Sequence, residues 1–139
     1  YTVEDTGGTG KNLVNTSDPD WYVGRLSPAT GNTTDQDQDK WVTTGYIPVT
    51  QETSYVASST ITTSGSRMNV TSSSRWYFFD AEKTYLGQTN GYKYNGGESY
   101  ITIDNSSMAF MRVSFSITNL TDYQIEVGTT MTDYEPYIG

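Results

Sequence analysis

The sequence predicts an all-β protein built as a β-sandwich. Short stretches rich in Val, Ile, Thr, Tyr and Trp are separated by turns rich in Gly, Asn, Asp and Ser. No stretch repeats apolar residues at the 3.6-residue spacing of a helix. Several stretches alternate apolar and polar residues, as strands with one buried face do. At 139 residues the chain fits one domain with a core of its own.

The domain is expected to span residues 12–139. Residues 5–11 are rich in Gly and poor in apolar side chains, so residues 1–11 are interpreted as a flexible linker or N-terminal extension. Beyond it we expect nine short strands, a number typical of a sandwich. These lie near residues 20–26, 40–47, 53–63, 66–71, 74–80, 91–95, 99–104, 109–117 and 122–128.

The clearest strand pattern lies in residues 109–117. One side carries Met111, Val113, Phe115 and Ile117, and the other is mainly polar, so we expect the first set to face the core. Residues 122–128 and 99–104 repeat the alternation.

The strand at 74–80 breaks this pattern, because both of its faces are aromatic. Strand periodicity directs Trp76 and Phe78 to one side and Tyr77 and Phe79 to the other. One pair is expected in the core, while the other covers or binds something.

Composition and charge narrow the function. The chain has no His and no Cys, which removes the commonest general base and thiolate chemistry. Its net charge of −8 disfavours nucleic acid and anionic membrane as partners. No apolar run is long enough to cross a bilayer, and the first residues do not resemble a signal peptide. We therefore expect an excised, soluble module.

Two short motifs superficially resemble ligand sites. Residues 7–11, Gly-Gly-Thr-Gly-Lys, lack the earlier Gly, the following Ser or Thr and the preceding strand of a phosphate-binding loop. Residues 35–39 place carboxylates as an EF-hand begins, but Lys40 and Tyr46 occupy its Gly and Glu positions, which favours a solvated loop. We expect no cofactor, although another Ca²⁺ site is left open, with the candidate ligands Asp18, Asp20 and Asp133.

Catalysis is not expected. A glycoside hydrolase needs two carboxylates about 5–10 Å apart across a cleft, and sequence spacing pairs none of the available ones. These are Asp80, Glu82, Glu98, Asp104 and Glu126.

The aromatic content favours a surface that binds sugars. The chain has three Trp and twelve Tyr, and such rings stack on the flat CH faces of sugars while polar side chains bond the hydroxyls. The expected carbohydrate-binding rings are Trp21, Tyr22, Trp76, Tyr92 and Tyr94, and the expected polar contacts are Asp20, Arg25 and Asn95.

Three segments resemble a known family. They are Trp41-Val42-Thr43-Thr44-Gly45-Tyr46-Ile47-Pro48-Val49 with Thr53-Ser54-Tyr55, then residues 78–86, Phe-Phe-Asp-Ala-Glu-Lys-Thr-Tyr-Leu, and finally residues 109–115 with the closing stretches 124–130 and 132–137. Together they resemble carbohydrate-binding jelly-roll modules of siphophage tail and baseplate proteins. The chain is most similar to modules inserted in evolved distal tail proteins of phages that infect lactic acid bacteria.

The resemblance implies a jelly roll of two antiparallel sheets that recognises host cell-wall polysaccharide. It assigns Trp41, Tyr46, Arg112, Glu126 and Tyr134 to the framework of the fold, where Arg112 and Glu126 are placed to pair across neighbouring strands. The implied location is the virion, at the tail tip or baseplate, next to other tail proteins.

We therefore expect a non-catalytic adhesion module. Because the module is itself acidic, a neutral wall polysaccharide is the expected target rather than polyanionic teichoic acid. The alternative is a structural or protein-docking domain of a tail, in which the second aromatic face of residues 74–80 covers a neighbouring subunit.

Overall fold

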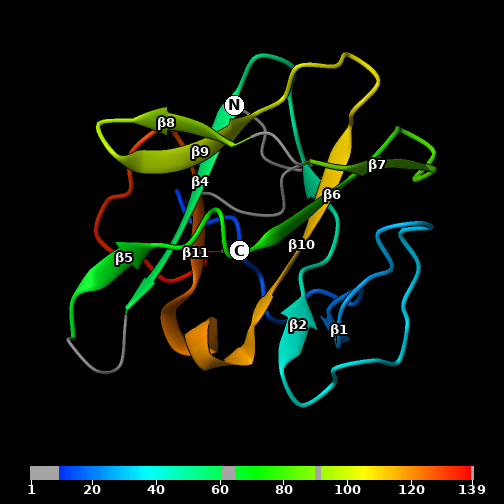
Figure 1. The fold of residues 1–139 in the computed structure, drawn as a ribbon, viewed down its shortest axis with the longest axis horizontal. Coiled ribbons are helices and arrows are strands. Elements are labelled where there is room, and N and C mark those ends of the chain that lie inside the picture. Colours follow the sequence, from blue (N-terminus) through cyan, green and yellow to red (C-terminus); the bar gives the residue numbers. More distant parts are fainter. Residues whose placement is uncertain (1–9, 61–64, 90–91, 139) are drawn as a thin grey trace.

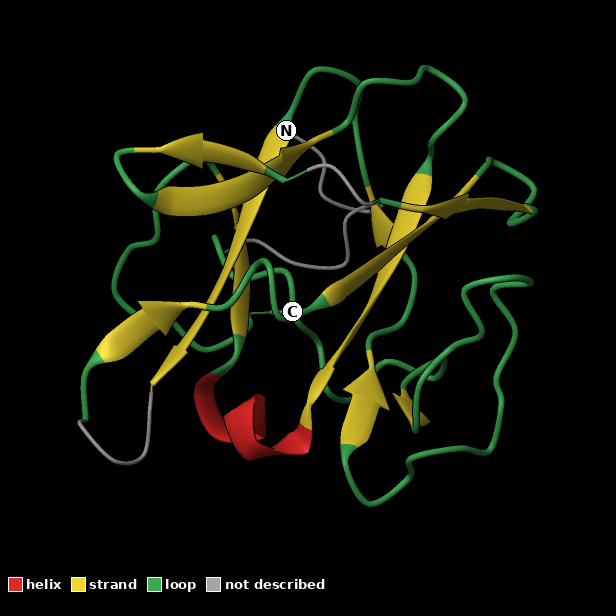
Figure 2. Cartoon of the chain, in the orientation of Figure 1, coloured by secondary structure: helices red, strands yellow, loops and turns green. Residues whose placement is uncertain are grey.

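The computed structural model describes residues 10–60, 65–89 and 92–138 and confirms the all-β class. Two antiparallel sheets form a β-sandwich (Figures 1 and 2). The first sheet has the order β1 (Tyr22–Val23), β2 (Trp41–Thr43), β10 (Phe110–Ser116), β6 (Arg75–Phe79) and β7 (Tyr85–Gln88), and β3 (Ile47–Pro48) also pairs with β10. The second has the order β11 (Gln124–Val127), β4 (Ser54–Thr60), β9 (Glu98–Thr102) and β8 (Lys93–Asn95), and β5 (Arg67–Asn69) also pairs with β4. Jelly-roll connectivity stays a prediction.

Several strand boundaries differ from those expected. The 40–47 stretch forms two strands, because Thr44 uses its side-chain hydroxyl to accept a hydrogen bond from the Val113 amide at 3.0 Å. The 20–26 stretch forms only the short β1. Strand β7 is not among the expected strands; it follows a tight turn closed by hydrogen bonds between Asp80 and Thr84.

The core lies between the sheets and takes apolar side chains from both. The first sheet contributes Val42, Ile47, Trp76, Phe78, Met111, Val113 and Phe115, and the second contributes Tyr55, Ala57, Ile101 and Ile125. Phe115 stacks on Tyr123, which precedes β11, with ring centroids 3.6 Å apart and nearly parallel planes. The stack joins the two layers.

Strand β10 confirms most of the expected alternation. Met111, Val113 and Phe115 are buried. Ile117 does not continue the pattern, because the chain turns there into the 3₁₀ helix η1 (Ile117–Asp122), whose N-cap is Ser116. Figure 2 shows this helix connecting β10 to β11.

Both faces of β6 are buried. Trp76 and Phe78 lie in the main core, whereas Tyr77 and Phe79 form a second cluster with Leu26 on the outer side of the first sheet. The Tyr77 hydroxyl donates to the carbonyl of Leu26 at 2.9 Å. The loop after β1 therefore covers the face that the sequence pattern left for binding or docking.

Gly31 lets this loop lie close to the sheet. Its φ is +72°, and a Cβ atom there would lie 2.5 Å from the ring of Tyr85. The Tyr85 hydroxyl also donates to the carbonyl of Pro28 at 2.7 Å. Only a residue without a side chain permits this approach.

The expected linker falls partly outside the described residues, which begin at Gly10. Lys11, which was expected in the linker, contacts the domain: its backbone amide donates to the Glu135 carboxylate at 3.0 Å. The part of the domain that the structure describes therefore begins before residue 12. Among the described residues, no helix is both long and apolar enough to span a membrane.

Candidate functional site

A groove with a volume of about 630 Å³ lies between the N-terminal segment, η1 and the C-terminal segment. Its lining consists of rings, small apolar side chains and neutral polar groups: Asn12, Val14, Asn15, Thr16, Ser17, Trp21, Leu120, Thr121, Tyr123, Tyr134, Pro136 and Tyr137. No charged side chain occurs among these described lining residues. We call it the Trp21 groove.

Three rings partly open to solvent line the groove. Trp21 is half-buried and packs edge-on against Phe115, with centroids 6.0 Å apart. Tyr134 is 41 % exposed. Tyr137 is half-buried, and burial raises the pKa of its hydroxyl, with a further increase from the Asp18 carboxylate. Its phenol is therefore a neutral group at physiological pH.

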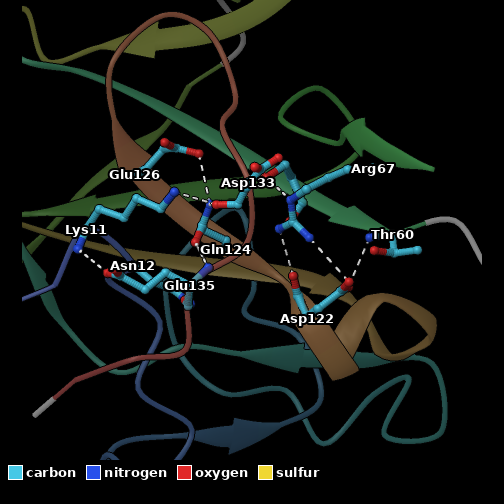
Figure 3. A network of polar contacts seen from close by, with 10 residues as sticks. Lys11, Asn12, Thr60, Arg67, Asp122, Gln124, Glu126, Asp133 and Glu135 are labelled. Carbon is cyan, nitrogen blue, oxygen red and sulfur yellow. Dashed lines mark hydrogen bonds and ion pairs between the residues drawn. The ribbon is translucent and has the colours of Figure 1, made fainter. Parts of the chain in front are cut away.

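Buried polar side chains hold the C-terminal wall in place (Figure 3). Gln124 and Glu126 project from β11 and are almost fully buried. The Gln124 amide oxygen accepts from the Glu135 amide at 2.9 Å. Glu126 accepts from the amide and the hydroxyl of Thr132, at 3.0 and 2.6 Å. These bonds fix the backbone on either side of Tyr134.

The N-terminal wall is tied to the same segment. The side-chain amide of Asn12 donates to the carbonyl of Glu135 at 2.9 Å, and its oxygen accepts from the Val14 amide at 3.0 Å. The Lys11 ammonium donates to the Thr132 hydroxyl at 2.8 Å and to the carbonyl of Asp133. Figure 3 shows Lys11 and Asn12 beside the C-terminal segment.

Arg67 supports the ring of Tyr134. Its guanidinium carbon lies 5.3 Å from the ring centroid, and the guanidinium pairs with the Asp122 carboxylate at 3.2 Å. Burial alone would raise the pKa of Asp122, but hydrogen bonds from Thr60 and the charge of Arg67 outweigh it and lower the pKa. The cation is therefore held against this ring.

This arrangement fits a small neutral polar ligand. Its volume lies within the range of about 300–1,000 Å³ that is typical of small-molecule sites. The rings offer flat apolar faces, and Asn, Ser, Thr and Tyr supply donors and acceptors without charge. The described lining residues include no carboxylate, His or Lys that could act as a general acid or base.

Of the expected ring set, Trp21 alone lines this groove. The prediction that Trp76 binds sugar is wrong. Its side chain is 0 % exposed, lies in the core, and donates its indole N–H to the carbonyl of Thr71 at 3.0 Å. Strand periodicity places it on one face of β6, and the second sheet covers that face. A sugar cannot reach it.

Three more of the expected site residues lie outside the Trp21 groove: Tyr22, Arg25 and Asp20. The Tyr22 hydroxyl accepts from the Asp35 amide at 2.7 Å, and Arg25 pairs with Asp37 at 2.7 Å. Both contacts hold the loop after β1. Asp20 is exposed and lines a different cavity, beside Tyr46 and Lys83.

The remaining expected site residues also lie outside the Trp21 groove: Tyr92, Tyr94 and Asn95. Tyr92 is half-buried and its hydroxyl donates to the carbonyl of Ser74 at 2.9 Å. Tyr94 is 67 % exposed on the short strand β8. Asn95 donates to the Thr129 hydroxyl at 3.0 Å. The expected site residues are thus not assembled into one site.

The expected pair between Arg112 and Glu126 is wrong. Arg112 belongs to β10 of the first sheet and Glu126 to β11 of the second, so they are not on neighbouring strands. The buried guanidinium donates instead to the carbonyls of Thr44, at 2.9 Å, and Asp20. It also lies over the ring of Tyr46, 4.8 Å from its centroid.

Sequence reasoning missed the contribution of Tyr134 and Tyr137 to the groove. The Tyr-Glu-Pro-Tyr stretch that contains them combines two rings with a proline outside any expected strand, and aromatic residues in such irregular segments are candidates for binding. That signal is present in the sequence, whereas the family resemblance assigns Tyr134 to the framework.

Acidic side chains do not gather into a metal site in the described parts of the chain, where no group of three or more potential ligands was found. Asp37 of the EF-hand-like stretch pairs with Arg25, and Asp18 accepts a hydrogen bond from the Asp20 amide at 2.8 Å.

Comparisons with protein-family models, with curated proteins and with solved structures found no match to this chain.

Proposed function

We propose that this chain is a non-catalytic carbohydrate-binding module that attaches a phage tail to neutral polysaccharide of the host cell wall. One observation carries the proposal: the Trp21 groove combines three accessible rings with an uncharged polar lining. A neutral sugar can stack on such rings and exchange hydrogen bonds without desolvating a charged side chain. The resemblance to tail modules supplies the biological setting.

Weak binding at one groove is compatible with firm attachment. A shallow sugar site reaches about millimolar affinity, close to −4 kcal/mol. Several copies on one tail tip that meet a repeating polymer raise the avidity by about 10² to 10⁴ without a new contact.

The alternative function, docking to a neighbouring tail protein, was inferred from an aromatic face that the structure covers. It relied on a spare aromatic face of β6, and the structure covers that face with Leu26 and the loop after β1. Binding to tail proteins in the absence of any glycan binding would still favour it.

The test uses ¹⁵N-labelled module and neutral oligosaccharides released from walls of lactic acid bacteria. The three Trp indole N–H signals report on separate places, and Trp76 in the core serves as an internal control for folding. We expect the Trp21 signal to shift. Tyr134→Ala should weaken this binding by up to about tenfold, since one stacked ring contributes about 0.5–1.5 kcal/mol.

Tyr94→Ala is the matched control, because it removes an exposed Tyr ring from β8, outside the groove. It should bind as the unmodified module does. The proposal fails if the neutral oligosaccharides leave the Trp21 signal unchanged at about 10 mM, well above the expected dissociation constant. It fails equally if Tyr134→Ala binds normally, or if incubation releases reducing sugar.

A further inference from the structure

A second groove, of about 340 Å³, shares no lining residue with the first. It is lined by Trp41, Ser72, Ser73, Ser74, Arg75, Gln88, Thr89 and Tyr92. We call it the Arg75 groove. Two rings, hydroxyls and an amide again line the space, but a guanidinium replaces the wholly neutral lining.

Strand register explains why Trp41 and Arg75 face the same side. Arg75 lies opposite Ser114 on β10, and Ser114 lies opposite Thr43 on β2. Trp41 is two residues before Thr43, so it projects from the same face of the first sheet. Both side chains therefore stand on the outer face, separated only by β10.

Arg75 differs from the other arginines of the chain. Arg25 and Arg67 pair with carboxylates at 2.7 and 3.2 Å, and Arg112 bonds to backbone carbonyls. The Arg75 side chain is exposed, and its guanidinium has no hydrogen bond or ion pair with any described residue. No carboxylate occurs among the described residues of its groove.

The ring of Tyr92 is held beside this cation. Its hydroxyl is fixed by the carbonyl of Ser74, at 2.9 Å. Burial raises the pKa of Tyr92, and the positive charge of Arg75 opposes that increase, as expected for a guanidinium close to the phenol. The groove thus presents a fixed ring beside a cation that is not paired with any described residue.

We propose that the Arg75 groove binds an acidic saccharide residue, with its carboxylate or phosphate on Arg75 and its ring against Trp41 or Tyr92. A guanidinium matches both anions through two parallel hydrogen bonds. The rings accept the apolar face of a pyranose. The inference extends the proposed function from a neutral to a charged sugar, but it concerns a different groove and can stand or fall separately.

The test titrates labelled module with D-glucuronate, D-glucose 6-phosphate, D-glucose and inorganic phosphate. We expect the Trp41 indole signal to shift with one or both acidic sugars, and the Trp21 and Trp76 signals to stay in place. Glucuronate and glucose 6-phosphate separate a carboxylate source from a phosphate source. Added NaCl should weaken the binding, since the groove is open to solvent.

Arg75→Gln should weaken binding of the acidic sugar by about tenfold or more, the usual value of a charge-assisted pair. Arg75→Lys should bind with intermediate affinity, because it keeps the charge and loses the planar fork. Arg25→Gln is the control, since it removes the same charge outside the groove. An unchanged Trp76 signal shows that each variant is folded.

Three results overturn the inference: glucose binding as well as the acidic sugars, inorganic phosphate alone binding as tightly as glucose 6-phosphate, or Arg75→Gln retaining full affinity. A response at Trp41 without any response of Trp21 to neutral wall oligosaccharides supports this inference and contradicts the proposed function. A response of Trp21 to neutral wall oligosaccharides without a response of Trp41 to acidic sugars supports the proposed function and contradicts this inference.

Discussion

The hydroxyl of Tyr123 lies 2.6 Å from the hydroxyl of Ser74 in the interior of the sandwich. Ser74 precedes β6 of the first sheet, and Tyr123 precedes β11 of the second. Ser74 also donates to the carbonyl of Val70 at 2.8 Å, so Tyr123 supplies the proton of the shared bond. One hydrogen bond therefore joins the layers beside the stack of Tyr123 on Phe115.

Tyr123→Phe should destabilise the module by about 0.5–1.5 kcal/mol, because a buried hydrogen bond is lost while the stacked ring remains. Ser74→Ala should cost about 1–3 kcal/mol, since it leaves the Tyr123 hydroxyl buried without its acceptor. Urea unfolding measures both variants. The double variant should cost less than the sum of the two, and strict additivity would contradict a direct bond.

Gly31→Ala should destabilise the loop that covers Tyr77 and Phe79. Gly65→Ala is its control, since Gly65 has nearly the same φ, +69° against +72°, but no atom of a described residue lies within 4 Å of the place where its methyl group would be. The control should cost about 1–2 kcal/mol for the left-handed backbone alone. Gly31→Ala should cost more, because the methyl group meets the Tyr85 ring. Equal midpoints in thermal unfolding would contradict this packing.

Glu126→Gln should loosen the C-terminal wall of the Trp21 groove. The carboxylate accepts hydrogen bonds from Gln124 and Thr132, and an amide can replace only some of them. We expect a loss of about 1–3 kcal/mol in unfolding free energy and faster hydrogen exchange near Tyr134. Glu82→Gln changes an exposed carboxylate on a turn and should leave both measurements unchanged.

The Asp122–Arg67 pair should make stability depend on pH on the acid side. The folded-state pKa of Asp122 lies below its ordinary value of 3.8, so this contribution is present above that pH and is lost as the pH falls through the folded pKa. The pair is partly exposed, which limits the effect to about 1 kcal/mol or less. Asp122→Asn should therefore lower the urea midpoint at pH 7 and change it less at pH 2.5. An equal difference in urea midpoint between the variant and the unmodified module at both pH values would contradict the prediction.

The sequence by itself determined the fold class and the core face of its most regular strand. Met111, Val113 and Phe115 alternate with polar residues, and a strand with that pattern has one stable way to face an apolar core. The same local rule could not decide the faces of β6, because all of Trp76, Tyr77, Phe78 and Phe79 are aromatic.

Only the tertiary structure decided which rings remain accessible. Burial of Trp76 depends on the opposing sheet, and burial of Tyr77 depends on a loop about fifty residues earlier in the chain. The Trp21 groove likewise joins residues from both ends of the described chain, held by contacts between Asn12 and Glu135. Local periodicity carries no information on such long-range partners, because side-chain direction repeats along a strand whereas burial depends on what packs against it.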